Sequence, residues 1–172
     1  IGVDEFTVEE VCRETGTYTS NINTVSQIVI SGDHMSLARA VDLLNARGAK
    51  RIINLPVSGA FHSELMQPAV DGLTEMLDSL NFTNPKFPII SNVKAKPIET
   101  GIELKEELIN QMKSCVQWSK TLDYLIGKGC NTFIEIGPGK VLTNFIKRLP
   151  GEYELMNVSD YDSANEIVKQ EL

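Results

Sequence analysis

The stretch "PVSGAFHSELM", residues 56–66, separates two different rhythms of secondary structure and places a histidine at the change. Before it, the pattern over residues 1–57 is strand, helix, strand, strand, helix, strand. After it, apolar strands alternate with helices as far as the C-terminus. His62 lies where an apolar strand is predicted to pass into a helix, which is a position suited to a catalytic base.

Residues 1–57 have the order of a ferredoxin-like fold. An apolar helical stripe follows the capping-box pair Thr7 and Glu10 and stops at Gly16. "TYTSNIN" and "QIVISG" are typical of two strands around a short turn. A second helix runs from Asp33 to Gly48, and "RIINLPV" predicts another strand. If "IGV" is the end of an earlier strand, residues 1–57 form a ferredoxin-like small subdomain with a truncated first strand.

Residues 58–172 indicate part of a larger α/β subdomain. One helix is predicted from residue 62 to about residue 80. Further helices are predicted at about 103–114, at about 117–127, over "KVLTNFIKRL" and at the C-terminus. The strands predicted between them are "FPIISNV", "NTFIEI" and "EYELMNV". Apolar strands that alternate with helices indicate a parallel sheet covered on both faces. Three strands cannot easily complete such a sheet. We therefore expect an α/β (α+β) chain that forms the C-terminal part of something longer.

The composition excludes several function classes. Of the 172 residues, 42% are hydrophobic and 23% charged, as in soluble globular proteins, and no apolar run reaches the length of a membrane span. The formal charge of −7 makes nucleic acid a poor partner. The three cysteines are widely spaced and form no CxxC pair, so we expect buried free thiols, no zinc site, and a reducing cytoplasm.

His62 is the candidate base, but its partner is not evident. Four residues before Met66, it falls on the apolar side of the predicted helix, and a helix start disfavours the imidazolium form. The sequence contains no G-x-S-x-G nucleophile elbow. Ser63 is a sequence neighbour, and adjacent helical residues point in different directions. A histidine with a hydrogen bond at a helix start and no chemical role is the alternative.

Two further features have a functional and a structural interpretation. Gln111 continues the apolar stripe of its helix near the end, where a main-chain carbonyl is free to hold the ring N–H of a histidine. A glutamine bonded to a neighbouring loop is the alternative. "EIGPGKVLT" could place a phosphate at a helix start near Lys140. It matches no nucleotide-binding pattern, however, so a tight strand-to-helix turn is favoured.

Four segments together carry a family resemblance: "NINTVSQIVISG", "LPVSGAFHSELM", "CVQWSKTLDYLIGKG" and "FIEIGPGKVLTNFIKRL". In this order they resemble the C-terminal half of malonyl-CoA:acyl-carrier-protein transacylases, the bacterial-type malonyltransferases of fatty acid synthesis. The resemblance covers essentially the whole chain. It implies a ferredoxin-like subdomain inserted in an α/β-hydrolase-like one, with the active site in the cleft between them.

The resemblance also implies a reaction and roles for particular residues. A serine attacks malonyl-CoA, forms a seryl ester, and passes the malonyl group to the phosphopantetheine thiol of acyl carrier protein. His62 matches the base, and Gln111 matches the residue whose carbonyl orients it. Phe61 resembles the bulky ring that excludes an α-methyl branch in malonyl-selective members. The polar residues that match the segment facing the cleft are Asn21, Asn23 and Gln27. One departure is "TVSQ", where the family usually has Ser-Pro-Gly before the glutamine.

The family's serine, its carboxylate-binding arginine and its oxyanion-hole glutamine belong to a first half that these 172 residues do not contain. We therefore expect the isolated chain to be inactive, with the missing N-terminal half, malonyl-CoA and acyl carrier protein as its partners. No metal or redox cofactor is implied, and coenzyme A enters only as a substrate carrier. Polyketide synthase acyltransferase domains and malonate decarboxylase subunits are related alternatives.

An alternative from another class is a non-catalytic module that docks an acidic carrier protein through a local basic surface. The candidate residues for that surface are Lys94, Lys96, Lys140, Lys147 and Arg148.

Overall fold

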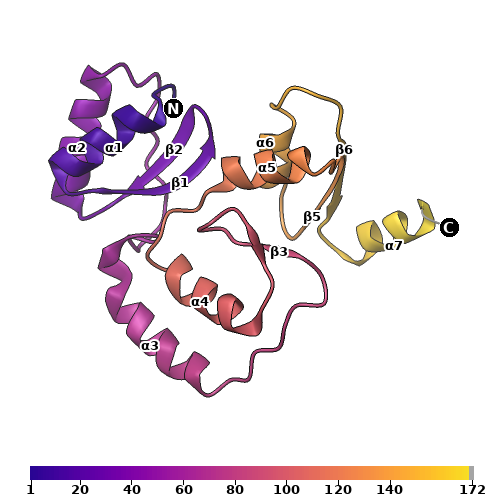
Figure 1. The fold of residues 1–172 in the computed structure, drawn as a ribbon. Coiled ribbons are helices and arrows are strands. Elements are labelled where there is room, and N and C mark those ends of the chain that lie inside the picture. Colours follow the sequence, from indigo (N-terminus) through magenta and orange to yellow (C-terminus); the bar gives the residue numbers. More distant parts are fainter. Residues whose placement is uncertain (171–172) are drawn as a thin grey trace. The chain divides into compact units, whose positions relative to one another are not determined.

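The computed structural model describes residues 1–170 (Figure 1). The chain consists of two compact units, with the boundary between Thr121 and Leu122. Both units mix helices with small two-stranded sheets, so the α/β class is confirmed. The subdomain boundary predicted between residues 57 and 58 stays a prediction.

The first unit begins with two helices that pack with a hairpin. The elements are α1 (Glu5–Thr15), β1 (Tyr18–Thr24), β2 (Gln27–Ser31) and α2 (His34–Ala46). The Asp4 carboxylate accepts a hydrogen bond from the Thr7 N–H, so α1 begins three residues earlier than the Thr7 pattern predicted. It ends, as predicted, at Gly16, which has the left-handed φ of 74° that glycine adopts without strain.

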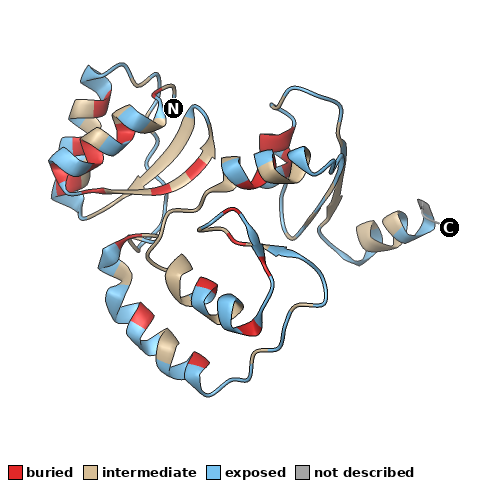
Figure 2. Cartoon of the chain, in the orientation of Figure 1, coloured by how far each residue is buried: buried red, intermediate tan, exposed pale blue. Residues whose placement is uncertain are grey.

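The core of this region lies between the helices and the hairpin. Its buried residues are Val3, Val8, Val11, Cys12, Ala40 and Leu44. Partly buried Ile28 and Ile30 of β2 pack against them. Figure 2 shows the buried positions of α1 and α2 in red. The two helices therefore bury one face each, as their apolar stripes predicted.

Residues 51–57, expected to form a strand, have no regular secondary structure. Ile53, Leu55 and Val57 are each about half exposed or more. An apolar composition alone does not make a strand, because the backbone of a strand also needs a neighbour with which to form hydrogen bonds. Among residues 1–170, this segment forms no ladder with another strand.

The rest of the first unit consists of a 3₁₀ turn, helices and one very short ladder. The elements are η1 (Glu64–Met66), α3 (Gln67–Asp78), β3 (Ile89–Ile90), β4 (Pro97–Ile98), α4 (Gly101–Gln111) and the start of α5 (Trp118–Gly127). Helices α3 and α4 pack together. The expected parallel strand "FPIISNV" is instead reduced to β3, which pairs antiparallel with β4 because the chain turns back at residues 91–96.

The second unit contains a strand–helix–strand arrangement. Its elements are β5 (Thr132–Ile136), α6 (Val141–Ile146), β6 (Glu154–Val158) and α7 (Tyr161–Gln170). β5 and β6 are parallel, in register from Thr132 opposite Glu154 to Ile136 opposite Val158. The predicted parallel pairing is thus present for these two strands. Phe145 and Ile146 of α6 are buried, whereas Ile136 is 80% exposed.

Within residues 1–170, none of the helices combines the length and the apolar composition that crossing a membrane would require.

We expect Val11→Ala to lower the free energy of unfolding of the first unit by about 2 kcal/mol, because it leaves a cavity at a position with no exposed surface. Val25→Ala is the matched control, since Val25 is 84% exposed. Urea unfolding followed by the fluorescence of Trp118, the single tryptophan, measures both variants. Equal midpoints for the two would contradict this account of the core.

Candidate active site

His62 occupies a strained turn and not a helix. Its φ is 59°, in the left-handed region, and its N–H donates to the carbonyl of Met112 at 3.1 Å. The expected helix start at His62 is therefore wrong, since α3 begins only at Gln67. The reason is Ser63, which is fully buried: its hydroxyl donates to the Ala60 carbonyl at 2.5 Å and accepts the Leu65 N–H. Ser63 thus caps the 3₁₀ turn η1 with an extended backbone, so helical structure begins after His62 and not at it.

The imidazole of His62 lies against the end of α4. Its Nδ1 is 2.7 Å from the main-chain carbonyl oxygen of Gln111, the last residue of that helix. A carbonyl oxygen can only accept a hydrogen bond, so Nδ1 carries the proton and Nε2 of the neutral ring keeps its lone pair. The structure thus brings together the two residues that the sequence singled out as base and orienting group.

The predicted substrate-binding residues lie on the neighbouring hairpin and turn. The Ser20 hydroxyl of β1 donates to the carbonyl of Phe61 at 3.2 Å, which joins β1 to the His62 turn. Asn21 bridges to Val116 in a parallel pair, and Asn23 occupies an irregularity where β1 has one residue more than β2. Gln27 pairs with Thr24 across the hairpin turn. Bulges of this kind redirect side chains and are common beside active sites.

The region also contains contacts that the sequence did not predict. Asn92 donates from its amide to the side-chain oxygen of Gln111 at 3.1 Å, and its carbonyl accepts the Gln117 N–H at 2.7 Å. Glu107, only 7% exposed, accepts hydrogen bonds from the Ser91 hydroxyl and the Val93 N–H. One signal was available: Glu107 precedes Gln111 by four residues and shares its helix face.

The cysteines are all unpaired, and Cys130 is exposed, so the expectation of three buried thiols is wrong for that residue. Burial raises the pKa of the Cys115 thiol to about 11, with a smaller contribution from the charge of Glu5. This thiol is therefore protonated at neutral pH and is no nucleophile for His62. Residues 1–170 hold no group of three or more histidine, cysteine or acidic side chains arranged to bind a metal.

The "EIGPGKVLT" segment forms the turn between β5 and α6, with left-handed backbone at Gly139 (φ 91°). The Glu135 carboxylate accepts the N–H groups of Leu142 and Thr143 and the Thr143 hydroxyl, at 3.1, 2.9 and 2.6 Å. Asn157 of β6 donates to the same carboxylate at 3.1 Å. The N–H groups that would hold a phosphate are thus bonded within the chain, which favours the interpretation as a structural turn.

These contacts set the acidity of Glu135. Partial burial of the carboxyl group acts to raise its pKa, but the hydrogen bonds from the Thr143 hydroxyl, the Thr143 and Leu142 N–H groups and the Asn157 amide outweigh it. The pKa falls from the ordinary 4.5 to about 2. The ionised carboxylate is therefore part of the folded second unit.

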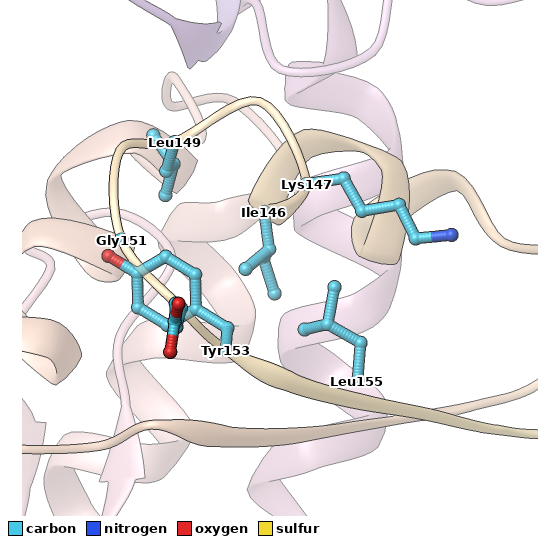
Figure 3. Close-up of a pocket in the computed structure, with 7 residues that line it drawn as sticks. Ile146, Lys147, Leu149, Gly151, Tyr153 and Leu155 are labelled. Carbon is cyan, nitrogen blue, oxygen red and sulfur yellow. The ribbon is translucent and has the colours of Figure 1, made fainter.

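The second unit also has a hollow of about 470 Å³ between the end of α6 and the start of β6 (Figure 3). Its lining consists of Ile146, Lys147, Leu149, Gly151, Glu152, Tyr153 and Leu155. In Figure 3 the Lys147 amine points away from the Tyr153 ring. The lining contains none of the residues predicted for catalysis or substrate binding, and of the candidate docking residues it contains Lys147.

The model of the acyl transferase domain family matches residues 4–167, and the chain belongs to this family.

Individual relatives narrow the comparison to malonyl transacylases. The malonyl CoA-acyl carrier protein transacylase of Bacillus subtilis (strain 168) is 44% identical over 141 residues, covering 82% of this chain and 44% of the relative. The Escherichia coli (strain K12) enzyme of the same name is 37% identical over 153 residues, covering 87% and 50%. This chain thus spans about half the length of the curated relatives it matches.

Solved structures give the same result. The crystal structure of MCAT from Streptococcus pneumoniae aligns with a TM-score of 0.91 at 33% identity, over 99% of this chain and 57% of that one. A malonyl-transacylase solved with a type II polyketide synthase acyl-carrier protein gives a TM-score of 0.92 at 32% identity, over 99% and 56%.

The stability that Glu135 gives the second unit should depend on pH. Because its pKa is lower in the folded state, the contribution is complete above pH 4.5 and is lost as the pH falls toward about 2. In an NMR titration, the amide signals of Leu142 and Thr143 should therefore shift with a midpoint near 2. A midpoint near 4.5 would contradict the lowered pKa of Glu135.

At neutral pH, Glu135→Gln should speed hydrogen exchange in α6, whereas Glu166→Gln, an exposed control on α7, should not.

Proposed function

We propose that this chain is the C-terminal part of a malonyl-CoA:acyl-carrier-protein transacylase and supplies its general base. The observation that carries the proposal is the 2.7 Å contact between His62 Nδ1 and the Gln111 carbonyl, in a chain of the acyl transferase family. The malonyl transacylases among its relatives support the substrate class.

In this proposal, Nε2 of His62 takes the proton of a serine hydroxyl as the serine oxygen attacks the thioester carbonyl of malonyl-CoA. The carbon–sulfur bond breaks, and the imidazolium returns the proton to the departing coenzyme A thiolate. The phosphopantetheine thiol of acyl carrier protein then gives its proton to the same nitrogen and attacks the seryl ester. The ester carbon–oxygen bond breaks, and the imidazolium returns the proton to the serine oxygen. The Gln111 carbonyl holds the ring in one tautomer and stabilises the imidazolium formed in each half-reaction.

The serine comes from the remaining part of a longer protein. Relatives about twice as long as this chain support this, as do its exposed apolar surfaces. Ile136 on β5 and Val57 in the first unit are 80% and 64% exposed. Parallel strands are normally buried on both faces, so a partner surface is expected over β5. Without that remaining part, the 172 residues contain the base His62 but no serine placed for His62 to deprotonate.

The family arrangement gives residues 1–57 and residues 58–172 separate places in the proposal. Residues 1–57 form the ferredoxin-like small subdomain, and residues 58–172 belong to the α/β-hydrolase-like large one. In support, the Ile1 ammonium donates to the Arg51 carbonyl at 2.8 Å, and the Gly2 N–H donates to the Ser26 carbonyl at 2.8 Å. These bonds place the first residues beside both residue 51 and the turn that leads into β2, as expected for the first strand of a ferredoxin-like fold.

Substrate contacts are assigned to the residues around the His62 turn. Phe61, 47% exposed, borders the acyl group and disfavours an α-methyl branch. Asn21, Asn23 and Gln27 of the hairpin provide polar contacts to the cleft. The protein works in the cytoplasm without a metal or redox cofactor, and coenzyme A takes part only as the substrate carrier.

The carrier-docking alternative has weaker support. A docking module would give no reason for the ring of His62 to be held by a helix-end carbonyl.

His62→Ala should reduce malonyl transfer by about 10²- to 10⁴-fold, because the serine then has no general base. The assay uses this chain joined to the N-terminal half of the Bacillus subtilis relative, with malonyl-CoA and acyl carrier protein. His34→Ala is the matched control, as it removes the only other histidine, which is exposed. Transfer at the parent rate by His62→Ala would overturn the mechanism.

The 172-residue chain alone should gain no malonyl group when it is incubated with malonyl-CoA and weighed by denaturing intact-mass spectrometry. A mass increase of one malonyl group on this chain would show a nucleophile within it and contradict the missing-serine proposal.

Phe61→Ala in the joined protein should relax selectivity between malonyl-CoA and methylmalonyl-CoA. A hydrophobic pocket discriminates one methyl group by roughly 1–3 kcal/mol, so the ratio of the two kcat/KM values should fall by about 10- to 200-fold. Phe87→Ala is the control, since Phe87 is 80% exposed. An unchanged ratio in Phe61→Ala would remove this residue from the acyl pocket.

A further inference from the structure

The two non-glycine residues with positive φ among residues 1–170 belong to one network of hydrogen bonds. They are His62, at 59°, and Ala95, at 51°. Left-handed backbone is unfavourable for both residue types and persists only where surrounding contacts enforce it. A second strained residue connected to the His62 site therefore calls for an explanation beyond the turn itself.

Ala95 closes a loop at residues 91–96 that is held by its own backbone. Its N–H donates to the Ser91 carbonyl at 2.9 Å, and the Ser91 N–H donates to the Lys96 carbonyl at 2.8 Å. The Ser91 hydroxyl accepts the Lys94 N–H at 2.7 Å. The loop is thus a closed turn whose geometry Ser91 organises.

Glu107 anchors this loop to α4. Its two carboxylate oxygens accept the Ser91 hydroxyl at 2.5 Å and the Val93 N–H at 3.1 Å. Ser91 and Glu107 are both buried, at 2% and 7% exposure. A buried carboxylate needs such donors, and each donor in turn would be left unsatisfied without it.

Asn92 transmits the position of the loop to the segment that holds His62. Its amide donates to the side-chain oxygen of Gln111, and its carbonyl accepts the Gln117 N–H. Asn92 is therefore bonded to both ends of the segment 111–117. In this segment, the Gln111 carbonyl bonds to the ring of His62 and the Met112 carbonyl bonds to its N–H. The same segment is fixed to β1, because the Val116 N–H donates to the Ser20 carbonyl at 2.8 Å.

We propose that Asn92 and Glu107 are positioning residues for His62: the Glu107-anchored loop fixes the Gln111 carbonyl through Asn92 and so keeps the ring in the Nδ1–H tautomer. The proposal deepens the proposed function and rests on it, since the tautomer matters for catalysis only if Nε2 accepts a proton. Neither residue touches the reacting atoms. Their effect is to remove the freedom of a helix end that would otherwise fray.

The test is the tautomer of His62, read from the ¹⁵N shifts of its ring in the 172-residue chain. The chain has two histidines, so exposed His34 serves as an internal reference in every spectrum. We expect His62 to be protonated at Nδ1 in the parent chain. In Asn92→Ala and in Glu107→Gln, the fraction protonated at Nε2 should rise several-fold while His34 stays unchanged.

Asn84→Ala is the matched control, because the Asn84 side chain bonds the other end of α4, accepting the Gly101 N–H at 3.0 Å. It should lose similar stability and leave the His62 tautomer unchanged. Asn92→Ala combined with Gln111→Ala should shift the tautomer no further than either single variant, since the two side chains act through one bond. Gln111→Ala retains the main-chain carbonyl and covers the case in which Glu107→Gln does not fold.

Parent-like His62 shifts in folded Asn92→Ala and Gln111→Ala would overturn the proposal, as would a parent ring protonated at Nε2. The measurement needs no serine, malonyl-CoA or carrier protein. If the parent chain failed to transfer malonyl in its joined form while the variants still shifted the tautomer, the proposed function would be refuted and the positioning network would stand.

Discussion

The site depends on one asymmetry of chemistry: a carbonyl oxygen accepts hydrogen bonds and cannot donate them. Placed 2.7 Å from Nδ1 of His62, the Gln111 carbonyl leaves the neutral ring only one tautomer that forms the bond. The last carbonyls of a helix have no partner within it, so the end of α4 supplies this acceptor without disturbing the helix. The left-handed turn at His62 and the bond from its N–H to Met112 bring the ring to that acceptor.

The sequence predicted the parts of this arrangement that local physics controls. The apolar stripe and the end of α4 identified Gln111, and the stop at Gly16 identified the end of α1. It failed where distant partners decide. "RIINLPV" and "FPIISNV" have the composition of strands, but residues 51–57 have no ladder and β3 keeps two residues. The turn at His62 depends on buried Ser63 and on Met112, fifty positions away, which no periodicity reveals.

The same distinction explains the exposed apolar residues. The apolar pattern of a sequence reflects the burial of its side chains in the complete fold. This chain spans about half the length of the curated relatives it matches. Ile136 therefore reads as a core residue in the sequence and is 80% exposed in the second unit. Val11, whose core cluster is formed by residues between Val3 and Ile52 of the same unit, is completely buried. Val11 and Ile136 are both apolar, so the difference in their exposure comes from whether packing partners are present around them.

The Glu135 contacts have a consequence for how an anionic substrate could be recognised. With its carboxylate bonded to the N–H groups of Leu142 and Thr143, the glycine-rich turn carries its own permanent anion. A phosphate arriving at this turn would meet a negative charge where a nucleotide-binding loop offers vacant donors. In this turn, the backbone donors that could bind a ligand instead connect β5 to α6 through the Glu135 carboxylate. A phosphate group would therefore have to be bound elsewhere and not by the backbone N–H groups of Leu142 and Thr143.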